Sequence, residues 1–294
     1  MANLKAIRIR ITSVKSTRQI TSAMKMVSAS KLRRAQDKIV RLRPYANKLH
    51  EILVGLSQSL AESEVENIYA RRSSPEKVLI IVITSNRGLC GGFNANVIKE
   101  TRRVVSEKYS DQFRNGNLRV LTIGKKGYDF FRKQNIKMLP EQNNLLNNLT
   151  FDIVALVAEQ VMKSYVSLEF DRVELIYNQF KNAAVQNITN EVFLPVETVT
   201  SGKVNAAPVD YIYEPDKEGI VRELVPKSLK IQFYKAVLDS FVAEHGARMT
   251  AMHKATDNAT SMIRDLTLQY NKARQSTITN QILEVVSGAE ALKG

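Results

Sequence analysis

The last sixty or so residues of the chain, from about Ile231 to Glu290, place mostly apolar side chains at alternating spacings of four and three residues. This heptad pattern, which no proline interrupts, predicts one long helix with an apolar stripe. At about 1.5 Å per residue, sixty residues extend over roughly 90 Å, about three times the diameter of a small domain. Most of this helix therefore needs a partner outside a compact fold. The stripe positions are Leu238, Val242, His245, Met249, Met252, Thr256, Ala259, Ile263, Leu266, Tyr270, Ala273 and Thr277.

A second long helix is predicted over residues 3–58. Apolar residues keep the heptad spacing from Leu4 to Val14, and the pattern resumes from Leu32 to Leu60. Between these two runs, residues 21–30 are rich in small side chains, and we expect them to break the register. Pro44 lies within the later heptads and predicts a local kink, because the pattern continues beyond it.

The simplest arrangement of these two helices is an antiparallel two-stranded coiled coil. The C-terminal helix carries a ridge of alanines at every fourth position, which permits close approach to the small residues 21–30. In that register, the numbers of paired positions sum to about 275. The last twenty residues then extend beyond the partner helix and carry apolar side chains with no partner in the chain. The ridge is Ala247, Ala251, Ala255 and Ala259, and the unpartnered residues are Ile278, Ile282, Val285 and Val286.

The middle of the chain alternates predicted strands with predicted helices. This order is typical of an open, Rossmann-like α/β sheet. Pro226 predicts a kink or a false start before the last helix proper. Strands are predicted over 77–84, 118–123, 172–180 and 188–196, and helices over 94–109, 125–134 and 151–168. We therefore expect three parts: an N-terminal coiled-coil helix over 1–60, an α/β domain over 75–200 and a C-terminal coiled-coil helix over 217–294.

The net charge of +14 is concentrated in one segment. Residues 1–50 contain thirteen Lys or Arg and a single acid, Asp37, whereas residues 231–294 contain seven basic and six acidic side chains. Along the first helix the charges lie roughly 6 Å apart, within the Debye length of about 8–10 Å, so they repel one another. An isolated run of charge is usually a solvated face. A run this long and one-sided favours an acidic partner at least as strongly.

Nucleic acid is one possible acidic partner, and an acidic protein cavity around the helix is another. Stacking aromatic residues are absent from residues 1–44, and the basic residues lie on several faces of the helix. Both observations favour the protein cavity. No apolar run is long enough to span a bilayer, no signal peptide is recognisable, and the single cysteine indicates a reducing compartment.

The turn Ser85–Phe93 (SNRGLCGGF) follows a predicted strand and precedes a predicted helix, where phosphate-binding loops occur. It matches no established nucleotide fingerprint, so a tight structural turn is the favoured interpretation. Cys90 is a weak candidate nucleophile, because the three histidines all lie in the long helices. No metal cluster, catalytic triad or paired carboxylates are recognisable, and we expect neither catalysis nor a cofactor.

Four motifs, in order along the whole chain, resemble the gamma subunit of F-type ATP synthases in its bacterial form. They are residues 20–31 (ITSAMKMVSASK), residues 87–92 (RGLCGG), residues 247–259 (ARMTAMHKATDNA) and residues 270–275 (YNKARQ), the last followed by Ile278-Thr279 and residues 286–289 (VSGA). The resemblance implies a central rotor shaft without chemistry of its own. It also implies that this shaft couples rotation of a membrane ring to conformational changes at the catalytic sites of an alpha/beta hexamer in a proton-translocating enzyme.

The resemblance also implies where partners bind. The alpha and beta subunits would surround the coiled coil, and the epsilon subunit and the membrane ring of c subunits would lie at its foot. The chain would be peripheral, on the cytoplasmic face of the bacterial plasma membrane, with no nucleic acid and no nucleotide bound. Residues implied to contact the hexamer are Met24, Lys25, Lys31, Arg33, Arg34, Arg248, Arg274, Gln275, Thr279, Ile282, Val285 and Val286. Tyr211 and Glu214 are implied to contact the ring and epsilon.

Overall fold

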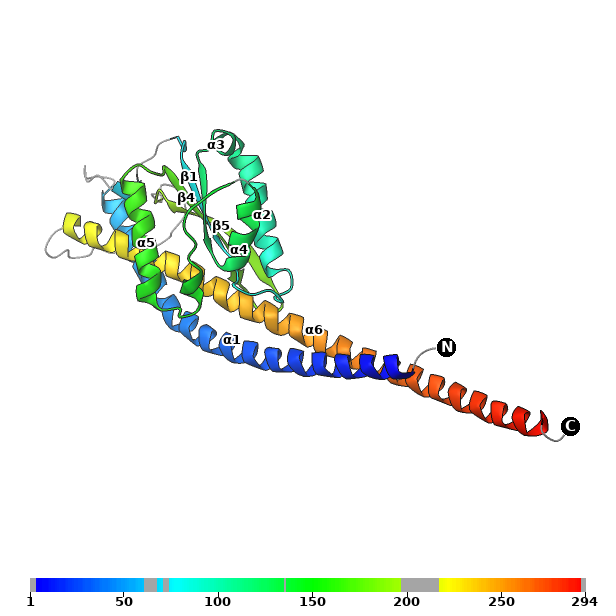
Figure 1. Cartoon of the computed structure of the whole chain (residues 1–294). Helices are drawn as coiled ribbons and strands as arrows, with labels where there is room; N and C mark the ends of the chain where they lie inside the picture. Colours follow the sequence, from blue (N-terminus) through cyan, green and yellow to red (C-terminus); the bar gives the residue numbers. More distant parts are fainter. Residues whose placement is uncertain (1–3, 61–67, 71–73, 135, 197–216, 292–294) are drawn as a thin grey trace. The chain divides into compact units, whose positions relative to one another are not determined.

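The computed structural model describes residues 4–60, 68–70, 74–134, 136–196 and 217–291 (Figure 1). The chain divides into two compact units, one made of residues 1–29 and 248–294 and the other of residues 30–247. Two helices contribute to both units. They are α1 (Leu4–Leu60) and α6 (Lys217–Ala291), each unbroken from its first to its last residue.

In the first unit the two helical segments lie antiparallel (Figure 1). The hydroxyl groups of Thr21 and Thr256 are 2.8 Å apart, so paired positions sum to 277, close to the predicted register. Each predicted stripe position from Met249 to Thr277 is buried or half-buried, and most of the positions between them are exposed. On α1, Leu4, Ile7, Ile11 and Val14 are half-buried among exposed neighbours. The heptad stripe is confirmed.

The expected break of register at residues 21–30 is wrong. The buried side of α1 passes through Thr21 and Ser28 to Leu32, and these positions keep the heptad phase. Polar side chains occupy the seam here because their hydroxyls are satisfied locally: Thr21 donates to the Arg18 carbonyl at 3.1 Å and Ser28 to the Met24 carbonyl at 2.8 Å. The seam side chains of α1 thus change from apolar to polar at Thr21 and Ser28, while the heptad spacing continues.

The second unit contains a five-stranded sheet in the order β3-β2-β1-β4-β5. The first four strands are parallel, and β5 pairs antiparallel with β4 at the edge. The strands are β1 (Val78–Ile83), β2 (Leu118–Ile123), β3 (Lys137–Met138), β4 (Arg172–Phe180) and β5 (Gln186–Leu194). The helices are α2 (Phe93–Lys108), α3 (Ser110–Arg114), α4 (Lys125–Phe131) and α5 (Phe151–Val166), with single 3-10 turns at Ile68–Ala70, Arg132–Gln134 and Asn143–Leu146. The predicted strands and helices of this region are confirmed.

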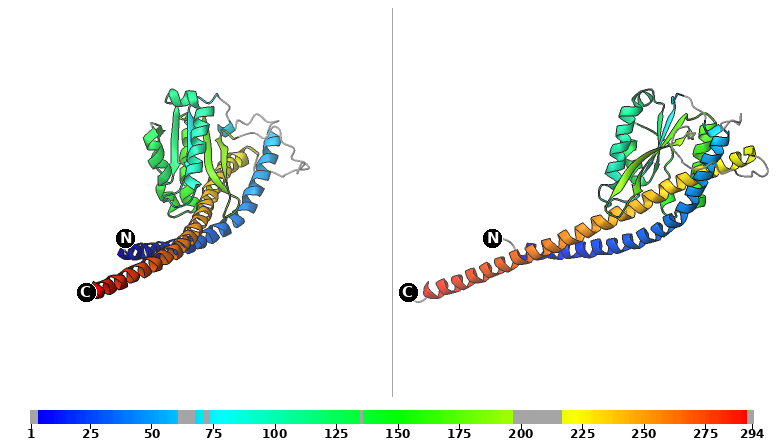
Figure 2. Two further views of the ribbon diagram at one scale, coloured as in Figure 1. Left: turned by 90° about the vertical axis from the view of Figure 1, so that its right-hand side faces the viewer. Right: turned by 180° about the vertical axis from the view of Figure 1, so that it is seen from behind.

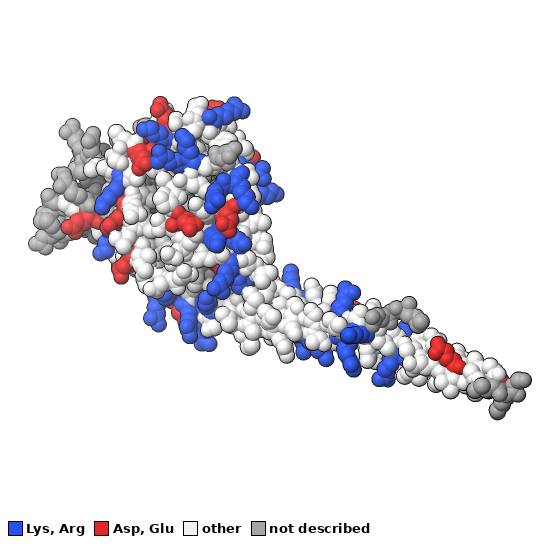
Figure 3. Space-filling view, viewed as in Figure 1, with Lys and Arg blue, Asp and Glu red and all other residues white. Residues whose placement is uncertain are grey.

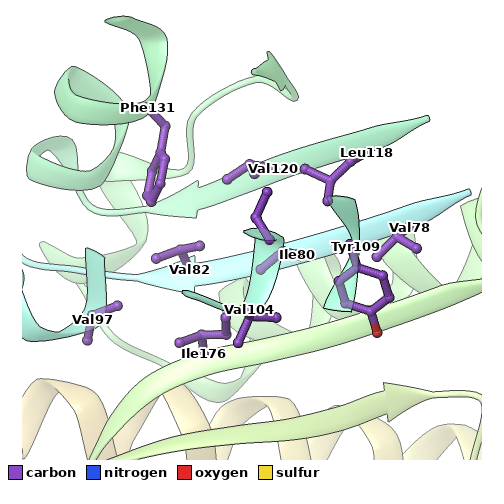
Figure 4. Close-up of a cluster of buried hydrophobic side chains, with 11 residues drawn as sticks. Val78, Ile80, Val82, Val97, Val104, Tyr109, Leu118, Val120, Phe131 and Ile176 are labelled. Carbon is purple, nitrogen blue, oxygen red and sulfur yellow. The ribbon is translucent and has the colours of Figure 1, made fainter. Parts of the chain in front are cut away.

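The apolar run of β1 lies at the centre of the sheet. All six of its residues are at most 1% exposed, which explains why the sequence shows no polar alternation there. On one face, alternate β1 side chains pack with α2, α4 and the neighbouring strands (Figure 4). That cluster includes Val78, Ile80, Val82, Val97, Val104, Tyr109, Leu118, Val120, Phe131 and Ile176. Helices α5 and α6 lie on the other face (Figure 2).

Helix α6 contains Pro226. It starts at Lys217 and passes through Pro226, so the proline is not a false start. A proline inside a helix removes one backbone hydrogen bond. The neighbouring side chains Val225 and Leu229 are 7% and 3% exposed, and their burial keeps this stretch helical. At the other proline, α1 continues past Pro44 to Leu60, as expected.

Candidate interaction surfaces

Among the side chains of α1 that the structure describes, the exposed charged ones are all basic except Asp37. Figure 3 shows Lys and Arg along the paired helices, with few acidic groups on the face in view. Lys31, Arg33 and Arg34 are all exposed and form no ion pair with any other residue that the structure describes. Their charge is therefore presented to solvent or to a partner. Met24 and Lys25, at the preceding turn, are half-buried against the seam.

Arg248 differs from the other residues implied to bind a partner. Its side chain is 7% exposed. Only a small part of it is thus available to a second protein in this structure. Arg274, Gln275 and Thr279 are exposed, and the Thr279 hydroxyl donates to the Gln275 carbonyl at 3.0 Å.

The tip of α6, defined here as residues 278–291, is exposed at every position. It includes Ile282, Val285 and Val286, which are 57%, 72% and 50% exposed. Its apolar line starts at Ile278, one residue beyond the last seam position, so it faces about 100° away from the seam. The tip contains two charged residues, both acidic. It is an apolar surface distinct from the coiled-coil seam.

The glycine-rich turn after β1 is closed by its own polar groups. The Ser85 amide donates to the Asn94 side-chain oxygen at 2.9 Å, and the Asn94 side-chain nitrogen donates to the Ser85 hydroxyl at 2.8 Å. Leu89 and Gly91 both have positive φ, near 60°. Cys90 is 2% exposed and packs with Phe93 in an apolar cluster. These features support the structural interpretation of the turn.

Two of the three histidines, His245 and His253, lie in α6. His245 is 5% exposed, and its ring meets Phe241 edge to face at 4.5 Å between centroids. The His253 ring nitrogen lies 3.4 Å from a carboxylate oxygen of Asp257, one turn further along the exposed face. Both contacts are typical of packed or solvated helix side chains.

A buried carboxylate lies at the start of β4, which the sequence analysis did not single out. Glu174 is fully buried and accepts hydrogen bonds from Lys108, Tyr109 and Arg172, the last at 2.9 Å. Burial acts to raise the pKa of Glu174, but these three donors outweigh it and hold the pKa below its usual value. The cluster ties α2 to the sheet. The signal in the sequence was an acid between two apolar residues of a strand, Val173 and Leu175.

A second carboxylate lies between the sheet and α6. Glu191 of β5 accepts a hydrogen bond from the Tyr177 hydroxyl at 3.4 Å and another from Gln232 of α6 at 3.5 Å. Burial raises the pKa of Glu191, and the nearby Asp239 adds to the rise. Gln232, Lys235 and Tyr177 act in the opposite direction.

Within the described residues, no group of three or more His, Cys, Asp or Glu is placed to hold a metal ion. Nor does any helix in the described part of the chain combine the length and the apolar character needed to cross a bilayer. Tyr211 and Glu214 lie outside the described residues.

Comparison with known proteins decides the family. A family model described as ATP synthase matches residues 3–292. Relatives named ATP synthase gamma chain include that of Flavobacterium johnsoniae, 55% identical over the full length of both chains, and that of Cytophaga hutchinsonii, 51% identical over 99% of each. The chain belongs to the family of ATP synthase gamma chains.

Solved structures agree with this assignment. A chain from the central stalk and c-ring of the Tetrahymena thermophila mitochondrial ATP synthase is 26% identical, with a TM-score of 0.59 over 80% of this chain and 99% of that one. A chain from the rotor of the Euglena gracilis mitochondrial ATP synthase is 22% identical, with a TM-score of 0.67 over 94% and 98% of the two chains. The chain is thus a non-catalytic subunit of ATP synthase, the shaft of its rotor.

Proposed function

We propose that the basic face of α1 and the tip of α6 are the surfaces through which this rotor shaft meets the alpha/beta hexamer. The observation that carries the proposal is the exposure of Lys31, Arg33 and Arg34, whose charges meet no acidic group among the described residues. The basic face comprises Lys31, Arg33 and Arg34, with Met24 and Lys25 on the same helix. The contacts on α6 comprise Thr279, Ile282, Val285 and Val286 of the tip, and Arg274 and Gln275 just before it. Arg248 contributes only through its small exposed part.

Two different contacts follow from the two surfaces. An exposed ion pair is worth about 0–1 kcal/mol and is screened by salt, so pairs between the basic face and acidic segments of the hexamer break and re-form easily. The tip instead offers apolar side chains and two acids, and it requires a surrounding surface that is apolar. Weak, renewable contacts along the shaft and an uncharged sleeve around its end both suit a part that turns.

The shaft is asymmetric, whereas the hexamer repeats the same pair of subunits three times. Each orientation of the shaft therefore places different groups against each catalytic site. A conformational equilibrium shifts only by the difference in contact free energy between its states. Rotation thus changes the nucleotide affinities of the three sites in turn, as a coupling free energy between sites.

The foot of the shaft is part of the same proposal. We infer that Tyr211 and Glu214 face the c-ring and the epsilon subunit, and that the chain lies peripherally on the cytoplasmic face of the plasma membrane. The parts expected from the sequence, residues 1–60, 75–200 and 217–294, are then the two helices of the shaft and the domain at its foot.

The decisive experiment reverses the basic face. In ATP synthase assembled with this chain and sealed in vesicles, the triple variant Lys31→Glu, Arg33→Glu and Arg34→Glu should lose ATP-driven proton pumping or fail to assemble. The isolated variant should keep its helix content, because these side chains are exposed. Normal proton pumping by the triple variant would refute the proposed surface.

A matched control carries the same change of charge elsewhere. Arg102, Arg114 and Lys133 are exposed on the α/β domain. Their replacement by Glu should leave proton pumping near its normal rate. If this control loses pumping as strongly, the effect reflects net charge and the assignment to α1 is wrong.

A further inference from the structure

The sheet has a topological switch point between β1 and β4. The chain passes from β1 through β2 to β3 on one side of the sheet, and then returns to place β4 on the other side of β1. In open α/β sheets, ligands bind outside the carboxyl ends of the strands at such a point. The segments that border this position here are the turn after β1 and the end of β4.

In this chain, helix α6 fills that position. Ala243 and Ala247 pack with Cys90 and Phe93 of the turn, and Phe180 at the end of β4 completes the apolar cluster. The α6 residues at this contact are small and share one side of the helix, at the spacing i, i+3 and i+4. We call this contact the seat, made by Ala243, Gly246 and Ala247 on α6.

Gly246 is the tightest point of the seat. A Cβ added there would lie 3.2 Å from the Cα of Ala183 and 3.4 Å from the Phe180 ring. Glycine inside a helix is less favourable than alanine, so its presence here has a packing reason. The glycine lets the helix backbone approach the backbone after β4.

The seat also defines the rotation of α6 about its own axis. The neighbouring residues Val242, Glu244 and His245 are all larger than the seat residues and are buried. Turning the helix by one residue, about 100°, would place Val242 and His245 in one sense, or Glu244 in the other, where small seat residues now pack. A second contact lies thirteen residues earlier, roughly 20 Å along the helix, where Phe233 and Phe193 rings meet at 5.5 Å.

We propose that the seat is the joint that locks α6 to the α/β domain, with Gly246 as its positioning residue, so that torque passes between the domain and the shaft at this point. The proposal rests on the rotor function argued above. In this proposal the domain holds α6 at the carboxyl ends of its parallel strands, where related open α/β folds bind ligands.

A wedge at the seat tests the proposal. In the assembled enzyme in vesicles, Gly246→Leu should lower the number of protons pumped per ATP hydrolysed, and Gly246→Ala should lower it less. The double variant Gly246→Leu with Phe180→Ala restores space and should regain part of the ratio. A normal ratio in Gly246→Leu, or no rescue by the second change, overturns the proposal.

A covalent lock provides the complementary test, and it applies even if the wedge prevents assembly. A disulfide between Gly246→Cys and Ala183→Cys, confirmed by mass spectrometry, should leave pumping and hydrolysis as they are after reduction, because a fixed joint does not move. Loss of activity that reduction restores would show that α6 and the domain move against each other, and would overturn the joint. If the unmodified chain fails to join the hexamer at all, the rotor function fails instead.

Discussion

Single residues with an unusual backbone conformation or a buried charge determine which substitutions the α/β domain accepts without loss of stability. Gly124 has φ of 108°, and an added Cβ would lie 2.2 Å from the Thr84 carbonyl oxygen. Glu174 accepts hydrogen bonds from three donors inside the sheet, whereas Glu191 is half-buried and has fewer compensating groups. Substitution should lower the stability of the chain at Gly124 and raise it at Glu191.

Gly124→Ala should destabilise the chain by on the order of 3 kcal/mol, because the methyl group would collide with a backbone atom at a φ that alanine rarely adopts. The midpoint of chemical unfolding of the purified chain measures this. Gly288→Ala is the control. Its Cβ would meet nothing within 4 Å, and alanine favours the helix. Equal midpoints for the two variants would contradict the steric argument.

Glu191→Gln should stabilise the chain at pH 7. The pKa of Glu191 is raised above its usual 4.5, so the folded state disfavours the carboxylate, and stability falls as pH rises from 4.5 through the raised pKa. Glutamine removes this loss, and its advantage should shrink as pH falls below 4.5. Unfolding midpoints at pH 7 and pH 4 measure the difference. A loss of stability at pH 7 would show that the carboxylate is favoured.

At the scale of the element, the two long helices show which features the sequence can define. The heptad positions of α6 predicted its buried side down to Thr277, because a coiled coil depends on a local repeat. The break of register expected at residues 21–30 was wrong. Thr21 and Ser28 can lie in the buried seam because their hydroxyls donate hydrogen bonds to carbonyl groups of their own helix. The false start considered at Pro226 was also wrong, because burial of its neighbours outweighs the helix-breaking tendency of proline.

The α/β strands and helices were predictable because their apolar runs and turns are local in sequence. The seat on α6 was not predicted. Ala243 and Gly246 look like any small residues in a helix, and only the three-dimensional position of the β4 end gives them a partner. Short elements without a strong apolar pattern, such as β3 and the 3-10 turn that follows, were likewise not assigned.

The register of the coiled coil can be checked by cross-linking. Thr21→Cys with Thr256→Cys should form a disulfide readily, because the two hydroxyl oxygens lie 2.8 Å apart. Thr21→Cys with Ser261→Cys should form none, because Ser261 is exposed outside the seam and lies five residues beyond Thr256, the partner of Thr21. Mobility on a non-reducing gel together with peptide mapping distinguishes them. A bridge in the second pair alone would mean that the helices are shifted.

At the scale of the whole molecule, folding and function use different parts of α6. The tip, residues 278–291, has every position exposed, whereas the seam before it is buried or half-buried. Surface apolar area of this kind adds nothing to the stability of the chain alone and becomes favourable only when a partner covers it. Stability and coupling should therefore separate on truncation.

Deletion of residues 278–294 should leave the thermal midpoint of the isolated chain unchanged and impair coupled ATP synthesis in the assembled enzyme. Deletion of residues 264–294 should lower the helix content of the first unit by more than the number of residues removed, because it also strips Leu266 and Tyr270 from the seam. Circular dichroism on heating measures both. A lower midpoint after the shorter deletion would mean that the tip packs on this chain.

The buried position of Cys90 has a practical consequence. It is the chain's single cysteine, and at 2% exposure its thiol is shielded from reagents in solution. A fluorophore or bead attached through a newly introduced surface cysteine would therefore mark one site on the folded protein without first removing the native thiol. Single-molecule measurements of rotation could therefore use the chain with its native cysteine in place.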